Sequence, residues 1–321
     1  MVRADFLHIV MHCSSPDARA WLYDEASQAV QDKATADLGP AAEVGDYETV
    51  EDCLDKSASV DLRNGDGEST ALIMAAENGH ATIVKLLLKR RCAIADAKNR
   101  TGFTALMKAS INGHKDCVKY LLEDEADKEL KDNNNFTALL HASNERHTNV
   151  VDVLLDKGAD TEVKDYRGLT ALLRASSNGH TDVMESLMLF GADKEARDNT
   201  NSTAILDASG SGYADPIEFL LLMGANKEAR NNLGYAPLLV ASSLGHTAIV
   251  GLLLKAGAKK EARDDRSKTA LIIASTNGHT AVVELLLEAG VRKGARDHIG
   301  LRALDWAENN DHDEVAALLQ Q

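Results

Sequence analysis

The 321-residue sequence is poor in proline, cysteine and aromatic residues. It contains 4 Pro, 4 Cys and 4% aromatic residues, which excludes a disulfide-dense scaffold and a core built around large rings. Cys13, Cys53, Cys92 and Cys117 lack the paired C-x-x-C spacing of a zinc site, so we expect reduced thiols. Because 44% of the residues are hydrophobic, the chain can still fold, and its core is expected to be aliphatic and helical.

Long hydrophobic runs and an excess of basic charge are also missing. The N-terminal stretch MVRADFLHIVMHCSS is interrupted by His8 and is too short and too polar for a signal peptide or a spanning helix. The formal net charge is −15, and residues 1–69 alone hold 15 acidic and 5 basic residues. An acidic chain repels phosphate backbones and anionic lipid, so we expect neither a nucleic-acid nor a membrane partner. We expect a cytoplasmic location, with the nucleus as an alternative, and no secretion.

What the sequence does contain is a repeat. The tripeptide TAL, or its equivalent APL or RAL, begins at Thr70, Thr104, Thr137, Thr170, Thr203, Ala236, Thr269 and Arg302. The spacing is 34 residues once and then 33 residues six times. A register this regular indicates one repeat array rather than several unrelated domains. We call these eight residues the markers and number repeats one to seven from Thr70.

Each repeat reads as two helices joined by a turn and followed by a polar loop. The marker Thr is a good N-cap, because its hydroxyl can accept a hydrogen bond from the first helical turn. A Gly follows nine residues later in most repeats, as at Gly179, and suits a turn with positive φ. Apolar residues three and four apart, such as Val151, Leu154 and Leu155, then predict a second amphipathic helix.

The 33-residue period and the T-x-L-x-x-A pattern resemble the ankyrin repeat family. The resemblance implies an all-α ankyrin repeat solenoid of about nine units including both caps. We expect an N-terminal extension (1–34) with a helix from Pro16 to Asp32, an N-terminal cap (35–69), seven repeats (70–301) and a C-terminal cap (302–321). The repeats are expected at 70–103, 104–136, 137–169, 170–202, 203–235, 236–268 and 269–301.

Three departures from the family pattern bear on stability. The T-P-L-H motif of the family becomes T-A-L followed by an aliphatic residue, and only Pro237 keeps the proline. Arg146 replaces the turn Gly of repeat three, at a cost of about 1 kcal/mol if φ stays positive. Repeat five carries Asp207, Tyr213 and Pro216, so we expect it to be the weakest repeat.

Polar residues that could suggest catalysis recur once per repeat. A His follows the turn Gly in most repeats, at His80, His114, His147, His180, His246, His279 and His312. A catalytic residue is not needed in every copy, so we interpret this row as a structural contact at the start of the second helix. Adjacent copies about 10 Å apart are also too distant to share one metal ion. Ser176 and its equivalents also recur once per repeat, so we interpret them as structural residues. We expect no enzyme activity, cofactor or metal.

A second row is charged. Lys or Arg recurs six residues before the markers, from Lys98 to Arg296, and Asp or Glu recurs two residues earlier, from Asp96 to Glu261. Mutual neutralisation of the two rows is one interpretation. A basic stripe for an acidic partner is the other.

The resemblance implies a protein-binding module, an adaptor or scaffold, that acts through a concave face of turn tips and inner helices. The candidate partner-binding residues are Arg100, Phe103, Ile111, Phe136, Tyr166, Arg167, Leu169 and Tyr235. Exposed aromatic and Arg side chains are typical of binding hot spots, although these rings could instead pack on neighbouring loops. The alternative function is a structural spacer whose terminal segments make the functional contacts. We expect a monomer that binds a protein partner.

Overall fold

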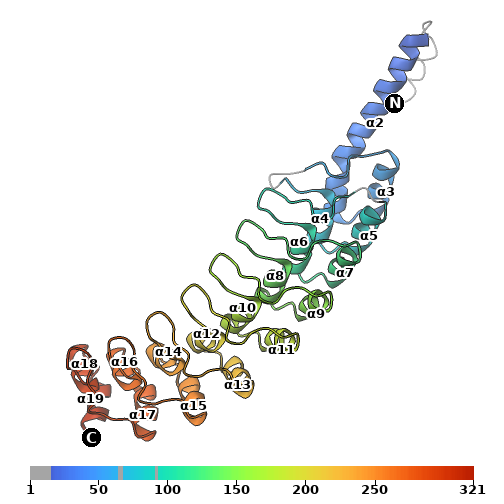
Figure 1. Cartoon of the computed structure of the whole chain (residues 1–321). Coiled ribbons are helices and arrows are strands. Elements are labelled where there is room, and N and C mark those ends of the chain that lie inside the picture. Colours follow the sequence, from blue (N-terminus) through green and yellow to red (C-terminus); the bar gives the residue numbers. More distant parts are fainter. Residues whose placement is uncertain (1–15, 64–67, 91–92) are drawn as a thin grey trace. The chain divides into compact units, whose positions relative to one another are not determined.

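The computed structural model describes residues 16–63, 68–90 and 93–321. The N-terminal stretch, Cys13 and Cys92 lie outside these ranges. Every regular element within them is a helix (Figure 1), and one isolated bridge pairs Arg263 with Thr269. The all-α class expected from the sequence is therefore confirmed. The helices belong to two compact units, Met1–Asn133 and Asn134–Gln321, which are described separately below.

The first unit stacks helix pairs in two layers, with α2 and α3 followed by α4 and α5 and then α6 and α7 (Figure 1). Its helices are α2 (Pro16–Val44), α3 (Tyr47–Asp55), α4 (Ala71–Glu77), α5 (Ala81–Lys89), α6 (Ala105–Ile111) and α7 (Lys115–Glu123). Helix α4 packs on α6, and α5 packs on α7.

Helix α2 is longer than the sequence predicts. It contains the expected helix Pro16 to Asp32 and continues without a break to Val44, across the expected boundary between extension and cap. Its C-terminal part packs on α3 and α4 through the buried residues Ala34, Leu38 and Ala42. This part therefore serves as the first helix of the cap, and the extension is an arm of the same helix.

The second unit repeats the same arrangement. Its helices are α8 (Ala138–Asn144), α9 (Thr148–Asp156), α10 (Ala171–Asn178), α11 (Thr181–Leu189), α12 (Ala204–Ser211), α13 (Ala214–Leu222), α14 (Pro237–Leu244), α15 (Thr247–Lys255), α16 (Ala270–Thr276), α17 (Thr280–Glu288), α18 (Ala303–Asn309) and α19 (Asp313–Gln320). Even-numbered helices pack on one another in one layer and odd-numbered helices in the other, which is the arrangement of a solenoid (Figure 1).

The marker threonines begin the first helix of their repeats as expected. The Thr170 hydroxyl accepts a hydrogen bond from the Leu173 N–H at 3.4 Å. Thr70, Thr104, Thr137 and Thr269 make the same bond. Such a cap contributes about 1 kcal/mol, because it satisfies a backbone donor that the helix itself leaves free.

The core of each repeat consists of small residues on the first helix and branched residues on the second. Val150, Val151 and Leu154 on α9 are 0% exposed, and Ala138 and Ala142 on α8 are buried with them. Burying one Val or Leu side chain contributes about 1.5–3 kcal/mol. Because Ala on the first helix lets neighbouring helices approach closely, this aliphatic core needs no large rings.

Repeats three and five carry the irregularities seen in the sequence. Arg146 keeps the positive φ (61°) of the Gly that it replaces, and its guanidinium pairs with Asp182 at 3.2 Å. In repeat five, Thr203 makes no side-chain cap, and its hydroxyl and Asp207 Oδ2 are buried without a hydrogen-bond partner among the described residues. Unpaired buried polar atoms destabilise a fold, which is consistent with repeat five as the weakest repeat.

Candidate functional site

The Ser, His and Asp residues near Thr170 do not form a catalytic group. Ser176 is fully buried and donates to the Ala204 carbonyl oxygen at 2.6 Å. His180 Nε2 lies 3.1 Å from the Asn144 carbonyl oxygen, and Asp182 accepts hydrogen bonds from Arg146 and Thr148. Each side chain is therefore engaged in a separate structural contact, and the serine hydroxyl is not accessible to a substrate.

Six residues of the recurring His row join their repeat or cap to the one before it. In both units, Nε2 of His80, His114, His180, His246, His279 and His312 lies 3.0–3.2 Å from a carbonyl oxygen at the end of the preceding first helix. The acceptors are Glu43, Glu77, Asn144, Gly210, Ser243 and Thr276. The structural interpretation of this row is confirmed, and its contact joins neighbouring repeats.

Residues of the two charged rows make hydrogen bonds to the backbone of the next repeat. In the second unit, Glu195 accepts from the Asn226 N–H at 2.8 Å, and Glu228 accepts from the Lys259 N–H at 2.8 Å. Arg230 donates to the Arg263 carbonyl oxygen at 2.7 Å, one repeat further on. These bonds join the loops of adjacent repeats, whereas mutual neutralisation of the rows and a basic stripe for an acidic partner both stay predictions.

An acidic or amide side chain fixes the shape of each loop. Asp165 Oδ1 accepts from the N–H groups of Arg167 and Leu169 at 2.7 and 3.0 Å. Asn99, Asp198, Asn231, Asp264 and Asp297 bind their own loops in the same way. Together with the charged rows, these bonds order the loops that carry them, so the residues at their tips project from a rigid frame.

In the first unit, the candidate residues differ in exposure. The Arg100 side chain is 68% exposed and its guanidinium lies 3.4 Å from the Glu68 carboxylate. Phe103 is half-buried, and Lys108 Nζ lies 4.7 Å from the centroid of its ring. Ile111, at the end of α6, is also half-buried. Arg100 is therefore available to a partner, whereas the Phe103 ring already packs against a cation.

In the second unit, the residue directly before the marker does not lie at the tip. Leu169 is only 5% exposed, so its expected exposure is wrong; its N–H is bound by Asp165 at the base of the loop. Phe136 and Tyr235, at the equivalent position, are half-buried, and the Arg174 guanidinium lies 4.6 Å from the Phe136 ring centroid. The sequence could not show this, because the loop bonds decide which residue turns inward.

The exposed tip residues of the second unit lie three and four positions before the marker. Tyr166 is 59% exposed and Arg167 beside it is exposed. Leu233, 65% exposed, and Ile299 occupy the position of Arg167 in other repeats. These side chains form the tip surface, which we define as Tyr166, Arg167, Leu233, Arg266 and Ile299.

A pocket of about 310 Å³ lies between two adjacent loops of the tip surface. Its lining consists of Asn232, Leu233, Tyr235, Asp264, Asp265, Arg266 and Lys268. Burial raises the pKa of the Tyr235 hydroxyl and lowers that of the Lys268 ammonium, which also lies 3.7 Å from the centroid of the Trp306 ring. An apolar wall with charges of both signs suits one side chain of a protein partner.

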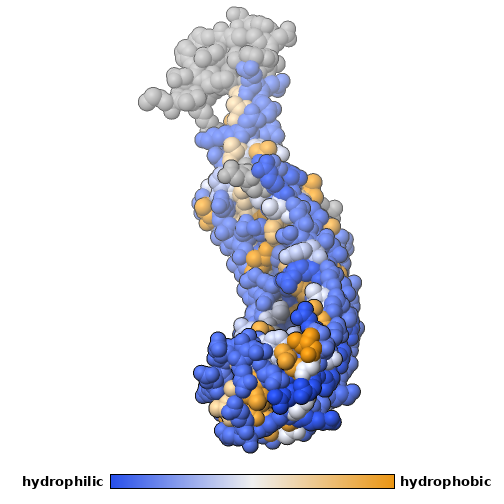
Figure 2. Space-filling view, turned by 90° about the vertical axis from the view of Figure 1, so that its left-hand side faces the viewer, coloured by the Kyte–Doolittle hydropathy of each residue, from blue (hydrophilic) through white to orange (hydrophobic). Residues whose placement is uncertain are grey.

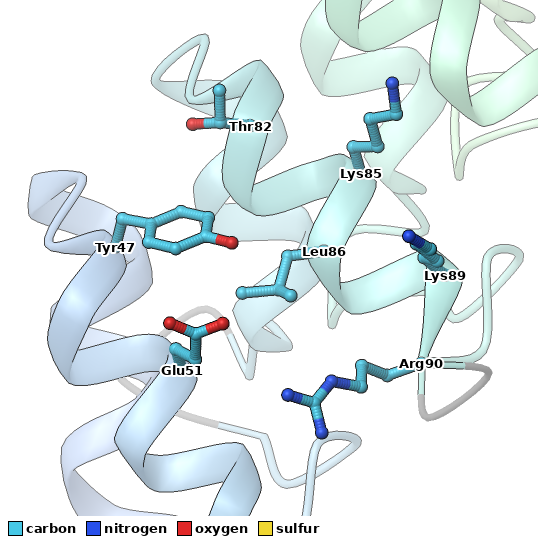
Figure 3. A pocket seen from close by; sticks show the side chains of 7 residues that line it. All are labelled: Tyr47, Glu51, Thr82, Lys85, Leu86, Lys89 and Arg90. Atoms are coloured by element: carbon cyan, nitrogen blue, oxygen red, sulfur yellow. The ribbon is translucent and has the colours of Figure 1, made fainter.

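The first unit contains a groove that sequence reasoning missed. It encloses about 740 Å³ between α3 and α5, where the Tyr47 ring faces Leu86 and the Glu51 carboxylate lies below both (Figure 3). Arg90 lies at the opposite edge and pairs with Asp55 at 3.1 Å. In the sequence, Tyr47 was the available signal for this groove, because only 4% of the residues are aromatic. The structure shows that its side chain is exposed.

The described residues offer no obvious site for metal or redox chemistry. Among them, no group of three His, Cys, Asp or Glu residues can hold a metal ion, and no helix is long and apolar enough to cross a membrane. Cys53 and Cys117 are buried free thiols, and burial raises the pKa of Cys117 to about 12. A thiol with so high a pKa is a poor nucleophile at neutral pH.

The sequence was compared with known proteins. A family model described as ankyrin repeats in three copies matches residues 38–132, 125–198, 172–264 and 238–321. No curated protein matched the chain.

Proposed function

Because the chain belongs to the ankyrin repeat family, we propose that it is a non-catalytic module that binds a protein partner through its loop tips. Ankyrin repeats are generally protein–protein interaction modules, and their fold is typically non-catalytic. The observation that carries the proposal is a rigid frame with exposed, dissimilar side chains at its tips. The recurring residues are used to hold the repeats together, so partner recognition falls to the residues that vary.

The tip surface combines the side-chain types that dominate binding hot spots. Tyr166 and Arg167 lie side by side in the loop of repeat three, and Leu233 and Arg266 line the pocket further along the unit. Because the loop hydrogen bonds already order the backbone, little conformational entropy is lost when a partner binds these side chains. Arg100 is the corresponding exposed candidate in the first unit.

Site-specific photo-crosslinking in the native cell tests this proposal. A photoreactive amino acid at Tyr166 or Leu233 should capture a defined protein, whereas the same amino acid at the exposed Glu284 on α17 should not. With the captured protein purified, the double variant Tyr166→Ser/Leu233→Ser should weaken binding about 30-fold, as expected for the loss of a hot spot. Equal capture at all three positions, or unchanged affinity, would contradict the tip assignment.

The spacer alternative makes a different prediction. Residues 24–33 of α2 are largely exposed, including Val30 at 50%, so the arm of this helix offers a contact surface of its own. If the array is only a spacer between terminal contact segments, the tip variant binds its partner normally. Removing residues 1–34 or the C-terminal cap then abolishes assembly with the partner. Removal of residues 1–34 also shortens α2, so substitution of Val30 by Lys is the cleaner form of the test.

A further inference from the structure

Four exposed hydrophobic side chains lie together at the ends of α11 and α13. They are Leu189 (83% exposed), Phe190 (43%), Leu222 (83%) and Met223 (39%), and we call them the helix-end patch. One face of the molecule is mostly hydrophilic, with hydrophobic residues in a few small groups (Figure 2). A group of large exposed apolar residues on neighbouring elements indicates an interaction surface.

The other repeats of the chain show that these hydrophobic residues are not required by the fold. Nineteen residues after the marker, the chain has Lys89, Glu123, Asp156, Leu189, Leu222, Lys255 and Glu288. Every repeat outside the patch therefore places a charge where repeats four and five place Leu. Charged residues at this position are compatible with the fold in the other repeats. The two leucines are therefore not required for the stability of their own repeats.

The patch is also held in place. The C-terminal ends of α11 and α13 belong to adjacent repeats in contact with each other, and Lys194 Nζ donates to the Met223 carbonyl oxygen at 2.8 Å. This bond ties the loop after α11 to the end of α13. The two leucines are therefore presented at a fixed spacing, about 10 Å for neighbouring packed helices.

The charges beside the patch have opposite signs at its two ends. Along the row of helix ends the exposed residues are Asp156, Leu189, Leu222 and Lys255, in that order. A two-fold axis between repeats four and five, perpendicular both to the row and to the helices, would turn a second copy so that its helix ends face those of the first and its row runs in the reverse direction. Leu189 then meets Leu222 of the second copy, and Asp156 meets Lys255. The row is complementary to itself in this one orientation.

We propose that the helix-end patch is the interface of an antiparallel homodimer. A parallel arrangement would set Asp156 against its own copy and Lys255 against its own copy, so charge repulsion opposes it. One turn earlier, Glu185 and Glu218 are both exposed and acidic, which confines the contact to the helix ends. A contact this small forms a weak, reversible dimer with a dissociation constant on the order of 100 μM. The sequence led us to expect a monomer, and with so weak a dimer the monomer is the form that predominates at low concentration.

The dimer leaves the proposed partner-binding function untouched, because the tip surface lies on the loops and the patch lies on the ends of the second helices. Two copies joined in this way would present two tip surfaces. A partner with two binding motifs would then be held more tightly than by either copy alone.

Sedimentation of the full chain over a range of concentrations tests the proposal. The wild type should approach twice the chain mass and no more, since a two-fold interface closes on itself. The variant Leu189→Lys/Leu222→Lys places on each helix end the residue found at Lys89 and Lys255, so it should fold normally and stay a monomer. Leu244→Lys, at an exposed Leu on α14 away from the patch, should dimerise like the wild type.

A charge-reversal cycle tests the orientation. Asp156→Lys alone and Lys255→Asp alone should each weaken the dimer on the order of fivefold, because each creates two like-charged contacts per dimer. The double variant Asp156→Lys/Lys255→Asp should return to wild-type strength. A wild type that remains monomeric up to about 1 mM, a dimer indifferent to the leucine variant, or a double variant weaker than either single one would each overturn the proposal.

Discussion

The Asp207 carboxyl should make the stability of repeat five depend on pH. Asp207 lies on α12 at the position from which Arg174 and Trp306, in other repeats, donate to the loop aspartate of their own repeat. Burial, with repulsion from Asp198, raises the pKa of Asp207 to about 6, although the Ser202 hydroxyl donates to it at 2.7 Å.

The sign of the effect follows from the direction of this shift. The folded protein binds the Asp207 proton more tightly than the unfolded chain, whose carboxyl has the ordinary pKa near 3.8. Asp207 therefore has no net effect below about pH 4, and it destabilises the fold progressively as the pH rises toward and through 6. A shift of about two units corresponds to about 3 kcal/mol, and partial exposure of the side chain reduces the expectation to about 1–3 kcal/mol.

The substitution Asp207→Asn removes the charge and keeps the shape. Urea unfolding of the full chain should show equal stability of variant and wild type near pH 4 and a gain for the variant above about pH 7. Hydrogen exchange of peptides from residues 203–223 should locate the gain in repeat five, because repeat arrays open locally. Asp215→Asn, at an exposed position on α13, controls for net charge. A variant effect that is the same at pH 4 and pH 8 would refute this reasoning.

Three further outcomes follow from the repeat contacts. His279→Ala should lower the free energy of unfolding by about 1–2 kcal/mol, because it removes the bond to the Ser243 carbonyl oxygen; an unchanged urea midpoint would contradict the role of this row. Gly245→Ala should be clearly worse than Gly257→Ala, since both have positive φ but only the first would place Cβ 2.8 Å from His279 Nδ1; equal losses in urea unfolding would argue against the close contact. Cys117 should resist iodoacetamide at about pH 8 in the native protein and react in urea, as peptide mass analysis can show; fast native labelling would contradict its burial.

The sequence predicts the parts of this fold that depend on local chemistry. A Thr before an apolar helix caps it wherever it occurs, so Thr70 and Thr170 could be assigned without coordinates. The same holds for the positive φ at Gly179 and at Arg146, since the turn between the helices requires it. These features repeat every 33 residues, and one copy supports the interpretation of the next.

What the sequence could not predict depends on contacts between distant segments. Leu169 looked like a tip residue, but the Asp165 side chain binds its N–H and turns it to the base of the loop. The backbone bonds of the charged rows could not be predicted either, because the sequence does not show which carbonyl and N–H groups of the next repeat lie beside these side chains. The helix-end patch became apparent only when exposure was known, since the sequence alone does not show whether a Leu at the end of a helix is buried.

The bonds between repeats have a consequence for how such a chain can change its length. In each bond of the His row that joins Nε2 to the preceding repeat the acceptor is a backbone carbonyl oxygen, and the residues that carry it are as different as Glu43, Gly210 and Ser243. A duplicated or exchanged 33-residue segment would therefore meet acceptable neighbours at both junctions without compensating substitutions. Recombination between copies that carry this His can thus alter the number and order of tip residues while the new junctions keep the bond of the His row.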